Sequence, residues 1–198
     1  MKHYEGFVRS GKSFAKVIGR PDEFHDAMGR ITLNFSYLED MTRNTIIVLS
    51  DVDSAVGRIL TSELSFRQKL DVLGSLIRNH VSKLPKNEKT HVVKERSLEI
   101  VSLCQKSEEL RNTYLHSSYA MHDSRSKTTS KAKHGLVITV ESVDSGLLLD
   151  VAEFIGETGY LVRSIPLILG LADFSRESHK GITYEKEGRL VACFGHGE

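Results

Sequence analysis

Apolar positions recur at helical spacing along most of the chain, and polar breaks separate the runs. From Pro21 to about Ser50 the apolar residues step by three or four, which is the period of an amphipathic α-helix. Pro21 and the two acidic residues after it suit the first turn of that helix. After a break and a short helix, Ser65 and Gln68 make a capping-box pattern that predicts a third helix, ending before Pro85.

Two longer helices are predicted in the second half of the chain. The segment from about Lys86 to Ser117 contains no glycine or proline and carries an imperfect apolar stripe, so we predict one helix there. Apolar residues at helical spacing also predict a last helix from Asp144 to about Arg176. Pro166 lies inside that helix and should kink or split it.

The pattern changes between these two helices. The run LVITVES, residues 136–142, alternates and is rich in β-branched residues, which favours a strand. The preceding SSYAMH, residues 117–122, could pair with it as a hairpin, and the polar segment 122–135 would be the loop between them. The chain end, residues 181–198, predicts a second small hairpin that turns at Glu187-Gly188.

These elements predict a mainly α fold, a four- to five-helix antiparallel bundle with a small β-hairpin insertion after the fourth helix. We expect three parts along the chain. Residues 1–20 form an N-terminal arm, residues 21–176 the helical domain, and residues 177–198 a C-terminal tail with a possible β-hairpin.

Composition narrows the class of protein. The chain has 198 residues, 39% of them hydrophobic, which suits a single domain with a real core. The net charge of +1 argues against a protein that coats nucleic acid by charge alone, although a local basic patch remains open. Cys104 and Cys193 are far apart and predict neither a disulfide scaffold nor a zinc site. We expect a cytoplasmic protein with no cofactor, no metal and no membrane span.

The stretch EELRNTYLHSSY, residues 108–119, carries the chemistry that stands out. Asn112 and His116 are four residues apart, so they share one face of a helix. Arg111 is rotated away from His116 by roughly 140° in a regular helix, but its side chain is long enough to swing back. Tyr119 would extend the same stripe if the helix continued that far.

These residue types match what RNA cleavage by transesterification requires. A base removes the proton of a ribose 2′-OH, and an acid protonates the 5′-oxygen that leaves. Histidine can do either near neutral pH. Arginine can hold the negative charge of the phosphorane, and asparagine can orient the imidazole or the phosphate. No metal is needed. The spacing alone, without further evidence, favours a solvated or structural role for these residues.

The segment RNTYLH resembles the R-x4-6-H motif of the HEPN superfamily, the helical-bundle ribonucleases of prokaryotic toxin and antiphage systems. In that family an Asn, Asp or His commonly follows the arginine, as Asn112 does here. FSYLED, residues 35–40, and LSFRQKLDVL, residues 64–73, are similar to segments of HEPN-like helices. The likeness spans roughly residues 21–175, and only the short motif is functionally specific.

The resemblance implies an α-bundle that forms a homodimer and cuts RNA without metal. Two motifs would face each other across a two-fold cleft, with Arg111, Asn112 and His116 as catalytic residues. An antitoxin or another defence-system protein would be a further partner. One departure concerns Tyr119. HEPN toxins that a nucleotidyltransferase silences carry R-x4-H-x-Y, and here the tyrosine lies one residue later, so control by its modification is not expected.

Four basic residues follow the motif, opposed by a single Asp123. They could contact RNA phosphates beside the cleft, or they could belong to a solvated loop. They are Arg125, Lys127, Lys131 and Lys133.

Glu39 is a candidate supporting residue in the first long helix. Its carboxylate could pair with Arg111 and set the position of that side chain, or it could be a surface acid.

Three hypotheses therefore stand. The first is a metal-independent endoribonuclease that acts as a homodimer. The second is a non-catalytic HEPN-like module that binds RNA or a protein. The third is an unrelated helical regulator in which Arg111 and His116 are structural.

Overall fold

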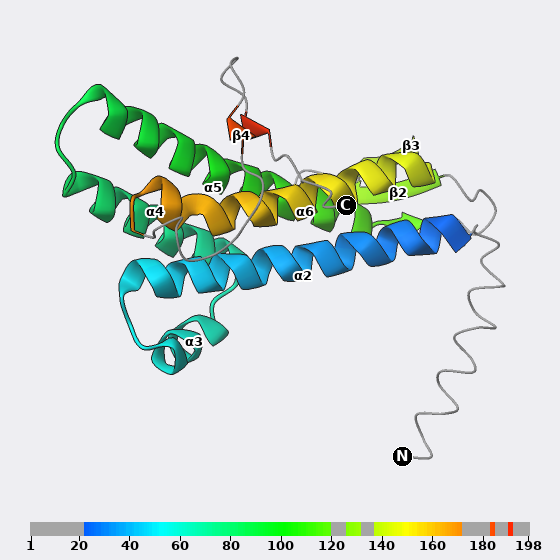
Figure 1. Cartoon of the computed structure of the whole chain (residues 1–198). Coiled ribbons are helices and arrows are strands. Elements are labelled where there is room, and N and C mark those ends of the chain that lie inside the picture. The colour runs from blue at the N-terminus through cyan, green and yellow to red at the C-terminus, as the bar shows by residue number, and fades with distance from the viewer. Residues whose placement is uncertain (1–21, 120–125, 132–136, 172–182, 185–189, 192–198) are drawn as a thin grey trace, which may run out of the picture. The chain divides into compact units, whose positions relative to one another are not determined.

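The computed structural model describes residues 22–119, 126–131, 137–171, 183–184 and 190–191, and it is mainly helical (Figure 1). Side chains are described for residues 23–117 and 143–171. Five helices occupy this part of the chain. They are α2 (Asp22–Ser50), α3 (Ser54–Ser62), α4 (Phe66–Ser82), α5 (Glu88–Leu115) and α6 (Ser145–Ile168).

The chain forms two compact units, and three helices contribute to both. Unit 1 combines Met1–Leu33 with Glu109–Glu153, so it holds the start of α2, the end of α5 and the start of α6. Unit 2 combines Asn34–Glu108 with Phe154–Glu198, so it holds most of the helical bundle. None of the helices in the described ranges is long and apolar enough to cross a bilayer.

Helix α4 begins where the capping-box pattern of the sequence predicts it. Ser65 caps α4 through a reciprocal box. Its Oγ accepts from the Gln68 backbone N–H at 3.3 Å, and Gln68 Oε1 accepts from the Ser65 backbone N–H at 2.8 Å. The predicted capping box is therefore confirmed. The core of unit 2 includes an edge-to-face pair, in which the ring centroids of Phe35 and Phe66 are 4.9 Å apart.

Helices α2 and α6 approach closely in unit 2. A Cβ placed on Gly159 would lie 2.8 Å from ring carbons of Tyr37, so the glycine makes room for the tyrosine ring. The Tyr37 ring also contacts that of Tyr160, with centroids 5.2 Å apart. Burial, and next to it the neighbouring Tyr160, raises the pKa of the Tyr37 phenol.

The last helix ends earlier than its predicted end at about Arg176. Gly170 adopts a left-handed φ of 72°, and its backbone N–H donates to the Leu167 carbonyl at 3.0 Å. The Leu171 N–H donates to the Pro166 carbonyl at 2.8 Å, which completes a Schellman motif. The helix therefore stops at Ile168, because glycine takes this conformation without a Cβ clash.

Pro166 lies inside α6 and does not split it. A proline has no N–H, so the carbonyl of Val162, four residues earlier, loses its usual donor. Thr45 of α2 supplies a replacement, since its Oγ1 donates to the Val162 carbonyl at 3.2 Å. Both residues are buried, with 3% and 0% exposure. The proline is thus accommodated by a side chain of the neighbouring helix.

Replacing Thr45 with valine should destabilise the protein by about 1–3 kcal/mol, because a buried carbonyl would lose its donor. Thr42→Val is the matched control. Thr42 is equally buried, but its Oγ1 donates to the Leu38 carbonyl inside the same helix at 2.8 Å, where a backbone donor is also available. Urea unfolding should show the larger loss for Thr45→Val, and a smaller loss when Pro166→Ala restores the backbone N–H. Equal costs for the two valine variants would contradict this account.

Unit 1 contains a small antiparallel sheet in the order β1-β2-β3. The strands are β1 (Ser118–Tyr119), β2 (Ser126–Lys131) and β3 (Val137–Ser142). We expected the segment after the fourth helix to pair with residues 136–142 across a polar loop. Instead β1 pairs with β2, and β2 pairs with β3, so part of the expected loop is itself a strand. That strand consists of serine, threonine and lysine, and it is supported by pairing with β3 along its whole length and with β1 at Lys127 and Thr128.

The C-terminal tail contains two short strands, β4 (Thr183–Tyr184) and β5 (Leu190–Val191), which pair antiparallel with Thr183 opposite Val191. The turn expected at Glu187-Gly188 lies outside the described residues, as do the N-terminal arm and Cys193.

Candidate functional site

Helix α5 carries the Arg-Asn-His trio at its C-terminal end, in unit 1. Arg111 is half-buried there, whereas Asn112 and His116 are exposed. The buried face of the helix is made mostly of small residues, which explains why its apolar stripe looks imperfect in the sequence. These residues are Ser97, Ile100, Val101, Cys104 and Ser107.

The structure brings the three predicted side chains together. Arg111 Nη1 lies 2.9 Å from Asn112 Oδ1 and 3.1 Å from His116 Nε2. Both distances are within hydrogen-bonding range. A regular helix rotates Arg111 away from His116, and the length of the arginine side chain overcomes that rotation, as expected from the sequence.

The end of α5 places His116 at the boundary between helix and sheet. The helix ends at Leu115, but the backbone N–H of His116 still donates to the Asn112 carbonyl at 3.1 Å. The Ser117 hydroxyl donates to the Thr113 carbonyl and so holds the last turn. His116 therefore directly follows a 28-residue helix and is held to its last turn by a backbone hydrogen bond.

Tyr119 does not continue the helical stripe. It lies in β1, where its Cα partner is Lys127 of β2. We expected Tyr119 to share the helical face only if the helix continued that far, and this condition is not met, because α5 ends at Leu115 and Tyr119 lies in a strand.

Two of the four basic residues lie on described backbone. Lys127 pairs with Tyr119, and Lys131 pairs with Val137, so strand β2 joins directly to the short strand that follows His116. Paired residues of adjacent antiparallel strands have Cα atoms about 4.5–5.5 Å apart. The backbone of Lys127 therefore lies beside Tyr119, which follows His116 by three residues. Arg125 and Lys133 lie outside the described residues.

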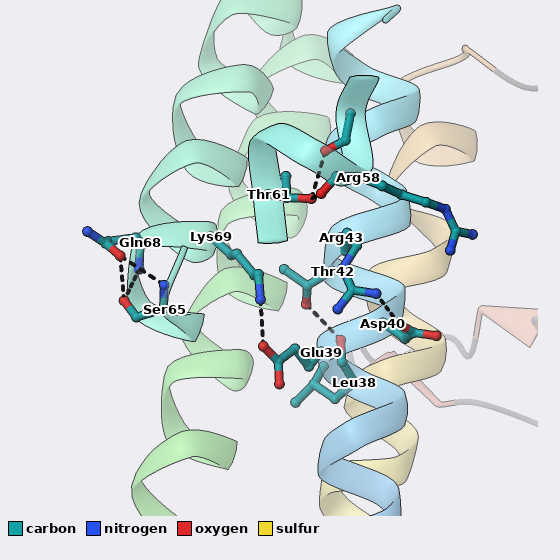
Figure 2. A network of polar contacts seen from close by, with 11 residues as sticks. Leu38, Glu39, Asp40, Thr42, Arg43, Arg58, Thr61, Ser65, Gln68 and Lys69 are labelled. Carbon is teal, nitrogen blue, oxygen red and sulfur yellow. Dashed lines mark hydrogen bonds and ion pairs between the residues drawn. The ribbon is translucent and has the colours of Figure 1, made fainter. Parts of the chain in front are cut away.

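Glu39 belongs to unit 2, where it contacts Lys69 of α4 (Figure 2). The Glu39 Oε1 is 2.5 Å from Lys69 Nζ, and the Lys69 side chain is only 3% exposed. The carboxylate therefore compensates a buried ammonium, and the suggested pairing of Glu39 with Arg111 stays a prediction.

The buried position of Lys69 was missed in the sequence, although its spacing carried a signal. Lys69 falls between Phe66 and Leu73 in the stripe that α4 turns toward the core. A lysine at such a position needs an acidic partner, because an unpaired buried charge is strongly unfavourable. Nothing in the local sequence shows that the partner is Glu39, thirty residues earlier.

Other kinds of catalytic group find less support in the described part of the chain. Burial raises the pKa of the Cys104 thiol to about 12, so this cysteine is not a nucleophile near neutral pH. Among the described side chains, no group of three or more His, Cys, Asp or Glu residues comes together as metal ligands would.

In the trio, the permanent cation of Arg111 lies within hydrogen-bonding distance of both the Asn112 amide and the His116 imidazole. Such a set can bind an anion and transfer a proton at the same place. Comparison with known proteins adds no relative, since no family model, curated protein or solved structure matches the chain significantly.

Proposed function

We propose that the chain is a metal-independent endoribonuclease of a prokaryotic toxin or antiphage defence system. The observation that carries the proposal is the contact of one guanidinium nitrogen, Arg111 Nη1, with both Asn112 and His116. The resemblance of RNTYLH to the R-x4-6-H motif supports the same conclusion. We extend the proposal to a HEPN-like fold with a β insertion after α5, to a cytoplasmic location and to regulation by an antitoxin or defence partner.

The proposed reaction is transesterification within the RNA. One imidazole removes the proton from a 2′-OH, and the 2′-oxygen forms a bond to phosphorus. The bond from phosphorus to the 5′-oxygen breaks, and a second, protonated imidazole gives its proton to that oxygen. The products are a 2′,3′-cyclic phosphate and a 5′-hydroxyl. Two His116 rings, one from each subunit of a homodimer, would supply the base and the acid.

Arg111 would stabilise the negative charge on the nonbridging oxygens as the phosphorane forms. Asn112 would hold the guanidinium in place through its Oδ1. The lysines of β2 would contact phosphates farther along the RNA, since β2 pairs with the segment that follows His116.

The test is cleavage of mixed cellular RNA by the purified full-length chain in EDTA. We expect cleavage to continue in EDTA, and we expect the products to carry 2′,3′-cyclic phosphate ends. DNA of matched sequence should stay intact, because it has no 2′-OH. Cleavage that EDTA abolishes would contradict the metal-independent mechanism. If RNA is not cut and expression in cells is not toxic, the chain is better described as a non-catalytic RNA- or protein-binding module.

A further inference from the structure

The contact between Arg111 and His116 determines where the imidazole proton lies. Arginine has five N–H donors, no acceptor, and a charge that it keeps at all ordinary pH values. Because Arg111 Nη1 is 3.1 Å from His116 Nε2, that ring nitrogen must accept. A proton on Nε2 would place two N–H groups against each other. In this arrangement the neutral ring of His116 carries its proton on Nδ1.

Asn112 engages the second proton of the same guanidinium nitrogen. Its Oδ1 accepts from Arg111 Nη1 at 2.9 Å, so both protons of Nη1 have acceptors. The donors that these two exposed side chains can still offer a ligand are the Asn112 amide Nδ2 and the His116 Nδ1–H. A ligand that bonds to both must bring acceptor oxygens, as a phosphate does.

The contact with Arg111 occupies the Nε2 lone pair of His116, which the proposed reaction needs in order to accept the 2′-OH proton. A phosphate oxygen is a stronger partner for a guanidinium than a neutral imidazole nitrogen, because the bond is assisted by opposite charges and can be bidentate. We infer that a phosphodiester draws Arg111 away from His116 Nε2 and thereby frees the lone pair only when substrate is bound. Arg111 would then be a positioning residue for His116 in the resting site and a phosphate ligand in the complex.

This inference deepens the proposed function and rests on it for one point only, that the phosphodiester belongs to RNA. The resting contact, and its displacement by an anion, do not require that RNA be cut. A catalytic assay and a measurement of the imidazole proton therefore test the two ideas separately.

Nitrogen NMR of the full-length chain with labelled histidine measures which ring nitrogen carries the proton. At about pH 8.5, above the usual range of imidazole titration, His116 should carry its proton on Nδ1. His80 provides an internal reference of the opposite kind. Its Nε2 lies 2.7 Å from the Leu49 carbonyl, which can only accept, so His80 should carry its proton on Nε2.

A short DNA oligonucleotide serves as the probe, because it brings phosphodiesters and has no 2′-OH to react. Titrating it should replace the single Nδ1–H form of His116 by an exchanging mixture of the Nδ1–H and Nε2–H forms, with no change at His80. The Nε2 lone pair is then free in the Nδ1–H fraction of that mixture. Arg111→Ala should give that shifted signal without any probe. Lys94→Ala is the matched control, since it removes an exposed positive charge from the same helix and should leave His116 unchanged.

Each outcome bears on the inference. A His116 ring protonated on Nε2 before any probe is added would overturn the resting contact. An Nδ1–H ring that stays unchanged while the oligonucleotide binds would overturn the displacement. If the ring responds as expected but RNA is never cut, the inference stands and the proposed ribonuclease activity fails.

Discussion

Replacing His116 with alanine is expected to reduce RNA cleavage by about 10²–10⁴-fold, because proton transfer is lost, and to leave RNA binding nearly unchanged. Arg111→Ala should lower both the rate and the affinity, since it removes charge stabilisation together with a phosphate contact. Arg111→Lys should restore only part of the rate, because an ammonium lacks the planar fork of a guanidinium. Single-turnover cleavage and a separate binding assay measure the two effects.

His91→Ala is the matched control for the histidine. His91 lies on the same helix, and its exposed side chain contacts only an exposed acid, Glu95, at 3.4 Å among the ion pairs described. Its loss should leave cleavage unchanged. His116 is also exposed, so its replacement should not change the unfolding midpoint. Cleavage at the wild-type level by His116→Ala would show that the catalytic group lies elsewhere.

Replacing Glu39 with alanine is expected to destabilise unit 2 by about 3 kcal/mol, since it would leave a buried ammonium without its partner. Lys69 is 3% exposed and Glu39 is 34% exposed, so the two replacements should not be equal. Lys69→Met should cost less than Glu39→Ala, because the carboxylate that remains can still reach water. The Glu39→Leu and Lys69→Met double variant should recover most of the loss, since no buried charge is left.

The neighbouring pair of Asp40 and Arg43 provides the control. Asp40 Oδ1 is 2.5 Å from Arg43 Nη1, but the side chains are 56% and 27% exposed. An exposed pair contributes about 0–1 kcal/mol, so Asp40→Ala should have a small effect on urea unfolding. A Glu39→Ala variant as stable as Asp40→Ala would show that Lys69 finds another partner or reaches water.

The helices were predictable from sequence because their signals are local. The spacing of apolar residues, the Ser65–Gln68 box and the absence of glycine and proline in α5 all act within a few turns. The trio was predictable for the same reason, since Arg111, Asn112 and His116 lie within six residues of one helix end. The length of an arginine side chain already allowed the contact with His116 that the structure contains.

The sequence signal for the end of α6 was also local, yet the prediction extended the helix too far. Gly170 was the signal, and the apolar residues on both sides of it made the helical pattern look continuous. The pairing of β1 with β2 was harder to predict, because residues 126–131 are polar and have no apolar face to fix their register.

The sequence alone therefore determined the helices of this protein and the residue types at the end of α5, because both depend on neighbours along the chain. Only the tertiary structure decided which distant groups meet. Thr45 donates to the carbonyl that Pro166 leaves open, and Glu39 compensates the buried charge of Lys69. These contacts join residues far apart in sequence, and each is required because a buried polar group without a partner is costly.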